Sequence, residues 1–177
     1  AERTPGQRAA GTGAAMNASG RSPLPDQRPR GAGPDWGTLA FPLKRHVSPH
    51  GQVTAVSMMK DEGPYVIEWV AHHLALGFDR IIVFTNDCSD GTDALLSAMA
   101  GNLPVEHYDN PGPYTAGTIQ KQALEMAFNL PQVRQAEWVL HIDADEYVNV
   151  TVGSRRIDDL IALFPEADAI AIQWRHF

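Results

Sequence analysis

The chain has 177 residues, a length that suits one domain, and a formal net charge of −7. The charge is unevenly distributed: residues 1–50 carry seven basic and three acidic side chains, whereas residues 51–177 carry seven basic and eighteen acidic ones. The acidic part is a poor candidate for binding nucleic acid, because that affinity comes mainly from Lys and Arg side chains that neutralise phosphates. The single cysteine, Cys88, excludes an internal disulfide and a cysteine-rich zinc site.

The location of the protein is indicated only by what its sequence lacks. No apolar run reaches the ~18 residues that a membrane-spanning helix needs. We therefore expect no transmembrane segment in this chain. We expect a cytoplasmic protein, either free or attached peripherally to the inner face of the membrane.

The N-terminal segment, residues 1–50, is rich in Gly, Pro and Arg and poor in large apolar side chains. Such a segment cannot bury enough surface to offset the entropy lost on ordering. We predict that it is largely disordered, and it is either an upstream extension or a basic tail with its own role. Residues 51–177 are predicted to form the folded domain.

From residue 51, short apolar segments alternate with helical patterns. We predict strands at 53–59, 80–85, 103–108, 138–142 and 169–174, and helices at 64–76, 92–99, 118–129 and 157–164. In the first helix, Pro64 suits the first turn, Gly77 ends the helix, and Ile67, Val70 and Leu74 recur at helical spacing. Alternating apolar strands and helices predict an α/β fold with a mostly parallel sheet and helices on both faces.

Acidic clusters follow three of the predicted strands. They are Lys60–Glu62, Asn86–Asp93 and Asp143–Glu146. In open α/β sheets, ligands bind beyond the carboxyl ends of the strands, so parallel strands would bring these clusters to one edge. So many carboxylates at one edge repel one another unless a positive group binds there. A divalent metal carrying a diphosphate is one solution.

The most specific pattern is Asp143-Ala144-Asp145, which directly follows a predicted strand. The spacing turns two carboxylates toward one side of a tight turn, and hard oxygen ligands suit Mg²⁺ or Mn²⁺. The alternative is a turn or helix cap that uses Asp for backbone hydrogen bonds. The position after an apolar strand favours the metal interpretation.

Three other patterns leave alternatives open. Asn86–Asp93 lacks the closing Glu of a calcium loop, and it is either a strand-to-helix turn capped by Thr92 or Ser89 or a ligand-binding loop. Glu68 and His72, four residues apart, favour a plain pair on the helix surface over a metal site. Lys121 faces either a phosphate or solvent.

The ordered combination of motifs over residues 53–177 resembles the family 2 glycosyltransferases, and the nearest branch is similar to bacterial, family 92-like proteins. The resemblance rests on Lys60–Glu62, Glu68-Trp69, His72-His73, Leu76–Asp79, Asn86–Thr92, Trp138 and His141–Tyr147. It implies a GT-A fold that binds a nucleoside-diphosphate sugar, usually with Mn²⁺ or Mg²⁺. The expected donor is a uridine-diphosphate sugar and the expected acceptor a glycan or glycoconjugate.

The resemblance also implies roles for individual residues. Glu62 and Asp87 would contact the base or ribose, Asp143 would lie near the ribose and sugar and hold the metal together with Asp145, and Asp61 stands where many relatives have Asn. The complete expected set of nucleotide-sugar-binding residues is Lys60, Asp61, Glu62, Asn86, Asp87, Asp90, Lys121 and Asp143.

The resemblance places the general base on the acceptor side, beyond Phe177, so we expect the domain to be incomplete at its C-terminal end. Two other functions stay open. One is a truncated or inactive module that binds a nucleotide sugar without transferring it. The other is a Mg²⁺-dependent nucleotidyltransferase, which would be expected to show a Gly-rich or basic phosphate-binding segment near the first strand, where the sequence offers only Lys60.

Overall fold

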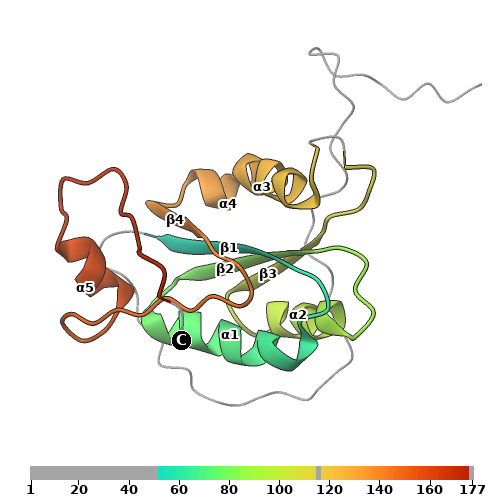
Figure 1. The fold of residues 1–177 in the computed structure, drawn as a ribbon, viewed down its shortest axis with the longest axis horizontal. Helices are drawn as coiled ribbons and strands as arrows, with labels where there is room; N and C mark the ends of the chain where they lie inside the picture. The colour runs from blue at the N-terminus through green and yellow to red at the C-terminus, as the bar shows by residue number, and fades with distance from the viewer. Residues whose placement is uncertain (1–51, 115–116, 176–177) are drawn as a thin grey trace, which may run out of the picture.

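The computed structural model describes residues 52–114 and 117–175, so the predictions for residues 1–50 lie outside the described residues. No helix within the described ranges is long and apolar enough to cross a membrane. The elements of the described chain follow one another as shown in Figure 1. They are β1 (Val53–Met59), α1 (Gly63–Leu76), β2 (Arg80–Thr85), α2 (Thr92–Ala100), β3 (Val105–Asp109), α3 (Ile119–Asn129), α4 (Pro131–Arg134), β4 (Trp138–His141) and α5 (Ile157–Ala162).

The four described strands form one parallel sheet in the order β3-β2-β1-β4. β1 and β2 are central and pair along their lengths, from Thr54 with Arg80 to Met59 with Thr85. β4 pairs with β1 over four residues and forms one edge of the sheet. The prediction of a mostly parallel α/β sheet is confirmed, and the carboxyl ends of β1, β2 and β4 meet at one edge as expected.

The predicted fifth strand, residues 169–174, is wrong. This segment has no regular secondary structure, and Ile172 and Trp174 are 44% and 72% exposed. Its apolar residues give it strand propensity, but a strand forms only where a neighbouring backbone supplies hydrogen-bond partners. No described strand pairs with it. The short helix α4 is the one element of the described chain that the sequence analysis did not predict.

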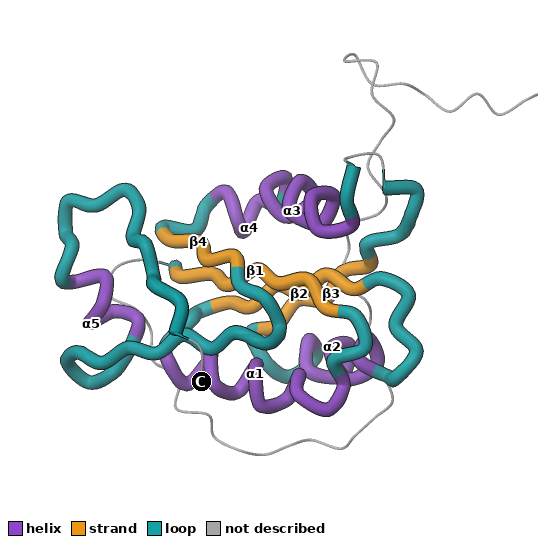
Figure 2. The backbone as a smooth tube through the Cα atoms, in the orientation of Figure 1, coloured by secondary structure: helices purple, strands orange, loops and turns teal. Residues whose placement is uncertain are grey.

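Helices cover both faces of the sheet: α1 and α2 lie on one side and α3 and α4 on the other (Figures 1 and 2). Successive strand residues point to opposite faces. Along β2, Ile81 and Val83 therefore join the cluster under α1 and α2, whereas Ile82 and Phe84 join the one under α3 and α4. Burial on both faces explains why the central strands are almost continuously apolar.

Helix α1 begins and ends where the sequence indicates. Pro64 lies in its first turn, and Gly77 ends it in the left-handed conformation, with φ 108°. The buried face, however, is rotated from the predicted one. It consists of Val66, Trp69, Val70 and His73, whereas Ile67 is 58% exposed. The buried face thus carries two aromatic rings, an indole and an imidazole, and leaves the predicted aliphatic residue Ile67 exposed.

The buried imidazole of His73 makes stability depend on pH. Desolvation lowers the pKa of His73 from 6.5 to about 4, although its hydrogen bond to the Trp69 carbonyl opposes this and the nearby His72 adds to it. The folded chain therefore keeps the ring neutral while the unfolded chain binds a proton below pH 6.5. This contribution to stability is complete above pH 6.5 and falls toward pH 4 by about 1.4 kcal/mol per pH unit.

We expect His73→Phe to remove this dependence while it fills the same space. The measurement is the free energy of unfolding in urea at pH 7 and pH 5, for the wild type and the variant. The variant should lose less stability than the wild type between the two pH values. Equal losses would contradict a buried neutral His73.

Candidate functional site

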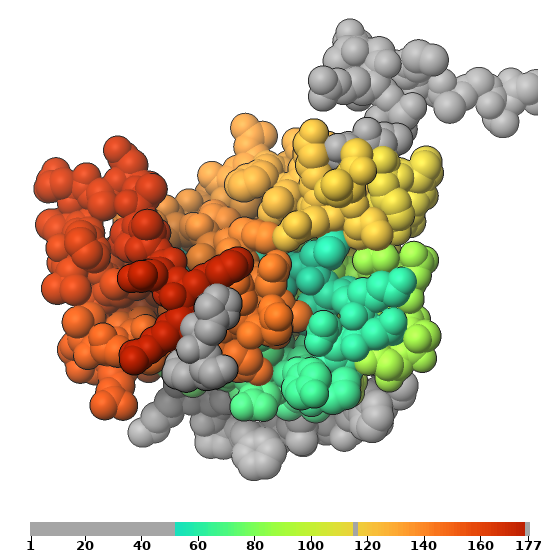
Figure 3. Space-filling view, viewed as in Figure 1, coloured from blue at the N-terminus to red at the C-terminus, as the bar shows by residue number. Residues whose placement is uncertain are grey.

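The loops that follow β1, β2 and β4 lie together at the carboxyl edge of the sheet. In Figure 3, the residues after β1 (cyan) and those after β4 (orange) lie side by side on the visible face. A direct contact joins two of these loops, since Ser89 in the loop after β2 donates to Asp61 after β1. Helix α1, which follows the β1 loop, contacts the third through Trp69, which donates to backbone carbonyls after β4. The three acidic clusters therefore form one surface.

The segment after β1 is held in shape by Asp61. This residue has φ 56°, a left-handed conformation that Asn and Asp tolerate better than most residues. Its carboxylate accepts hydrogen bonds from the Ser89 backbone N–H at 2.6 Å and from the Ser89 hydroxyl at 3.1 Å. Lys60 is exposed and Glu62 is half-buried. The left-handed backbone is a physical reason why Asn and Asp suit position 61.

The predicted ligands after β2 differ in exposure. Asn86 is buried, whereas Asp87 is exposed and has φ 47°. Asp87 Oδ2 lies 3.4 Å from the Asn86 amide nitrogen and 3.5 Å from the hydroxyl of Tyr114, and both groups donate to it. One side of the Asp87 carboxylate is thus supported by neighbouring donors.

Asn86 and Asp87 line a hollow of about 370 Å³ at the ends of β2 and β3. The hollow also contains two residues that the sequence analysis missed, Asp109 and Asn110. Asn110 is fully buried, and its side chain bonds to the Ile119 carbonyl and the Gln122 amide. Both residues directly follow the predicted strand 103–108, so the placement of polar residues at the carboxyl ends of parallel strands is the signal that could have identified them.

Asp90, a predicted nucleotide ligand, already serves the protein backbone. One carboxylate oxygen accepts from the Gly63 N–H at 2.7 Å, and the other accepts from the Thr92 N–H and hydroxyl at 2.9 and 2.6 Å. The bonds from Thr92, more than that from Gly63, lower the pKa of Asp90. These contacts favour a role in joining the loop to α1. The helix cap expected from Thr92 or Ser89 is not formed, and Gly91 is the capping residue of α2.

The turn after β4 shows an alternation that orients the two acids. Ile142 and Ala144 are buried, whereas Asp143 and Asp145 are exposed. The side chains of Ile142 and Ala144 belong to the cluster under α1, so the two carboxylates between and beyond them project outward. Glu146 folds back, and its carboxylate accepts from the Asp143 N–H at 3.1 Å. The turn thus presents Asp143 and Asp145 to the same solvent-facing edge.

Helix α3 reaches this turn through Gln120 and not through the predicted Lys121. The Gln120 amide donates to Asp143 Oδ1 at 3.3 Å. Lys121 is exposed, and its backbone N–H is bonded at 3.0 Å to the hydroxyl of Thr118, which caps the helix. No sequence signal distinguished the two neighbouring residues, since the contact depends on how α3 lies on the sheet.

In residues 52–114 and 117–175, no group of three or more His, Cys, Asp or Glu side chains is placed to hold a metal ion. Two exposed carboxylates, Asp143 and Asp145, are nevertheless a suitable donor set for Mg²⁺ or Mn²⁺. Mg²⁺ typically binds one or two protein carboxylates and takes its other ligands from water and substrate phosphates. The residues present therefore fit such an ion.

The parallel sheet, its helices on both faces and the acidic carboxyl edge define an α/β domain with its candidate site at the carboxyl ends of the strands. Residues 53–177 match the family model of glycosyltransferase family 92, and the chain belongs to this family. The resemblance to family 92 seen in the sequence is thereby confirmed.

Similar proteins include two plant members of family 92. The one from Ricinus communis is 24% identical over 63% of this chain and 19% of its own length. The one from Oryza sativa subsp. japonica is 24% identical over 59% of this chain and 17% of its own length. The chain thus matches less than a fifth of each relative. Among solved structures, residues 1–349 of S. aureus TarS align with a TM-score of 0.41 and 17% identity, over 63% of this chain and 30% of TarS.

Proposed function

We propose that this domain binds the nucleoside-diphosphate part of a sugar donor at the carboxyl edge of the sheet, for transfer of the sugar to a hydroxyl group of an acceptor glycan or glycoconjugate. The observation that carries the proposal is the pairing of a nucleoside-sized hollow with an outward-facing Asp143/Asp145 turn at one edge. Membership of family 92 supports the reaction class.

The hollow after β2 and β3 suits a nucleoside. Asp87 and Asp109 supply carboxylate oxygens, which accept hydrogen bonds from ribose hydroxyls or from base N–H groups. The buried Asn86 and Asn110 shape the wall and add amide groups. Uridine diphosphate is the first nucleotide to test, because it is the donor type that the family resemblance implies.

The diphosphate and metal belong at the neighbouring turn. Asp143 and Asp145 would hold Mn²⁺ or Mg²⁺, with Gln120 supporting the Asp143 carboxylate. When bound, such an ion neutralises the charge that develops on a departing diphosphate. Lys60 directly follows β1, and Lys121 lies in the first turn of α3 beside Gln120. Both side chains are exposed, and we keep them as candidate phosphate contacts.

The proton acceptor for the attacking hydroxyl is not assigned to a residue of the described chain. Glu146 is adjacent to the turn, but its carboxylate is engaged by the Asp143 N–H. That bond favours a structural role for Glu146 in holding the turn. The family resemblance places the general base on the acceptor side.

A nucleotidyltransferase is less well supported by the loop after β1. Phosphates commonly bind at the N-terminus of the helix that follows such a strand. Here the Asp90 carboxylate occupies that position and accepts the Gly63 N–H. A carboxylate at this site repels a phosphate, which supports the proposal that the diphosphate lies beside the Asp143/Asp145 turn instead.

Asp87→Ala tests the nucleoside part of the proposal. The variant should bind uridine diphosphate at least about 10-fold more weakly than the wild type, because a hydrogen bond to a charged group contributes about 1.5–3 kcal/mol. The loss should appear with Mn²⁺ and with EDTA alike. The measurement is calorimetric titration of the folded protein.

Asp168→Ala is the matched control, since Asp168 is an exposed carboxylate beside a separate hollow that also contains Trp138, the first residue of β4. Its affinity for uridine diphosphate should equal that of the wild type. Equal affinities of Asp87→Ala and the wild type would contradict the placement of the nucleoside. A folded wild-type chain that binds no nucleotide would contradict the proposed donor site as a whole.

A further inference from the structure

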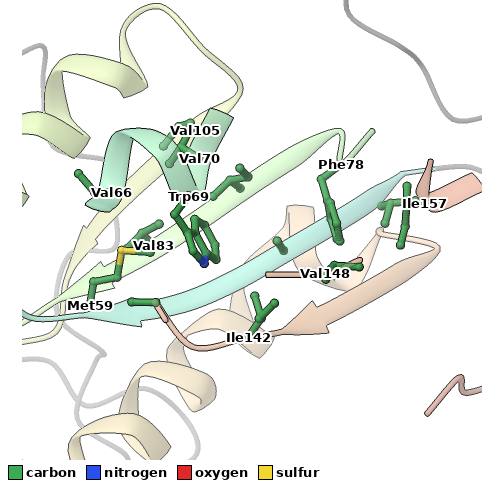
Figure 4. Close-up of a cluster of buried hydrophobic side chains, with 14 of the residues drawn as sticks. Met59, Val66, Trp69, Val70, Phe78, Val83, Val105, Ile142, Val148 and Ile157 are labelled. Carbon is green, nitrogen blue, oxygen red and sulfur yellow. The ribbon is translucent and has the colours of Figure 1, made fainter. Parts of the chain in front are cut away.

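Two side chains of α1 bond to the backbone of residues 143–148, which include the acidic turn, and a third side chain of α1 packs against them. Trp69 is fully buried, and its indole N–H is shared between the carbonyls of Asp143 at 3.2 Å and Glu146 at 3.0 Å. Figure 4 shows this indole projecting from α1 into the cluster that also contains Ile142 and Val148. The indole therefore ties together the first and last residues of the Asp143–Glu146 turn.

His72 makes a second connection two residues further along. Its Nε2 lies 2.8 Å from the carbonyl oxygen of Val148, and because a carbonyl can only accept, this nitrogen carries the hydrogen. The ring also meets the edge of Tyr147 at a centroid distance of 5.1 Å. His72 is thus not a plain partner of Glu68 on the helix surface.

His73, the third of these α1 side chains, contacts Trp69. Its Nδ1 donates to the Trp69 carbonyl at 2.8 Å, and its ring packs 4.2 Å from the indole, measured between centroids. The Tyr147 ring also stacks on the His73 ring, at a centroid distance of 6.1 Å. The indole is therefore fixed by packing, so its N–H is aimed at the turn before any ligand arrives.

The turn is also held by Ala144, which is buried in the cluster under α1, and by the Gln120 amide, which donates to Asp143 Oδ1. It lies beyond the last paired residue of β4, and its internal bonds are Glu146 N–H to the Asp143 carbonyl and Asp143 N–H to the Glu146 carboxylate. We propose that Trp69 and His72 are positioning residues, which hold the Asp143–Val148 backbone so that the two carboxylates at 143 and 145 converge on one cation. The link to a cation rests on the proposed function, whereas the hold on the backbone does not.

Trp69→Phe tests the hold on the backbone without any ligand. The variant keeps an aromatic ring but removes the N–H, so the amides of Asp143 and Glu146 should exchange with solvent at least about fivefold faster. Amides of β2, such as that of Ile82, should be unchanged. Trp138→Phe is the matched control, because Trp138 packs against the same cluster from the start of β4.

Hydrogen exchange followed by NMR gives a clear decision. Faster exchange confined to the turn in Trp69→Phe, and absent in Trp138→Phe, is the expected result. Unchanged exchange at Asp143 and Glu146, or an equal increase throughout the sheet, would overturn the proposal. This outcome does not depend on whether the chain binds a nucleotide.

Metal-dependent binding gives the second readout. Trp69→Phe should weaken binding of uridine diphosphate in Mn²⁺ by about 10-fold and leave binding in EDTA unchanged. His72→Phe should behave similarly, and His72→Gln, whose amide can donate to Val148, should restore most of the affinity. If the wild type binds with Mn²⁺ and both α1 variants bind equally well, positioning of the cation site is refuted while the proposed function stands.

Discussion

Asp145→Ala is expected to abolish the metal-dependent part of nucleotide binding. The exposed carboxylate of Asp145 is one of two that the turn presents, and an ion that depends on two protein ligands cannot easily lose one. Loss of a residue that merely supports a ligand weakens metal affinity by about 10–100-fold, so loss of the ligand itself should cost at least about 100-fold. Titration of uridine diphosphate with Mn²⁺ measures this directly.

The same titration in EDTA separates the proposed metal site from the proposed nucleoside site. Asp145→Ala should bind in EDTA as the wild type does, because the hollow after β2 and β3 is intact. Asp168→Ala again serves as control and should retain the full response to Mn²⁺. A response to Mn²⁺ that survives in Asp145→Ala would show that the ion binds elsewhere.

Phe84→Ala should cause the largest loss of stability. Phe84 lies on the central strand β2, is fully buried and stacks on Tyr108 at a centroid distance of 5.4 Å. Truncation of a buried Phe to Ala typically costs about 3–5 kcal/mol, partly through the cavity that remains. Domains of this size are stable by only about 5–15 kcal/mol, so the variant should be close to unfolding. Urea denaturation gives the value.

Phe128→Ala is the matched control, since Phe128 is 59% exposed on α3. An exposed position away from caps and buried networks should change the free energy of unfolding by about 0.5 kcal/mol or less. Equal losses of stability in the two variants would contradict the packing of α3 and α4 over the Phe84 face of the sheet. A loss below about 1 kcal/mol in Phe84→Ala would contradict its place in the core.

Local patterns predicted most of the fold. β1 and β2 were predicted at their observed bounds, because strands buried on both faces are almost continuously apolar. The ends of α1 followed from Pro64 and Gly77, whose backbone preferences are local. The failures were non-local: residues 169–174 have strand propensity without a pairing partner, and the face of α1 depends on what Trp69 packs against.

The acidic residues of the candidate site could be predicted from the sequence, but the residues that hold the acidic turn in place could not. Asp143 and Asp145 follow an apolar strand, and the alternation with Ile142 and Ala144 makes both point outward. Trp69 and Gln120 could not be found in this way, since each reaches the turn from an element distant in sequence. Sequence spacing identifies residues on one turn, but contacts between elements require the packing of helices on the sheet.

The central claim is that the carboxyl edge of this sheet binds a nucleoside diphosphate through a divalent cation. Its most direct test is calorimetric titration of uridine diphosphate into the folded wild-type chain, once with Mn²⁺ and once with EDTA. We predict saturable binding that is at least about 10-fold tighter with Mn²⁺, because Asp143 and Asp145 would hold the ion, which would neutralise charge on the diphosphate. Binding equally tight in EDTA, or no binding in either condition, would contradict the account.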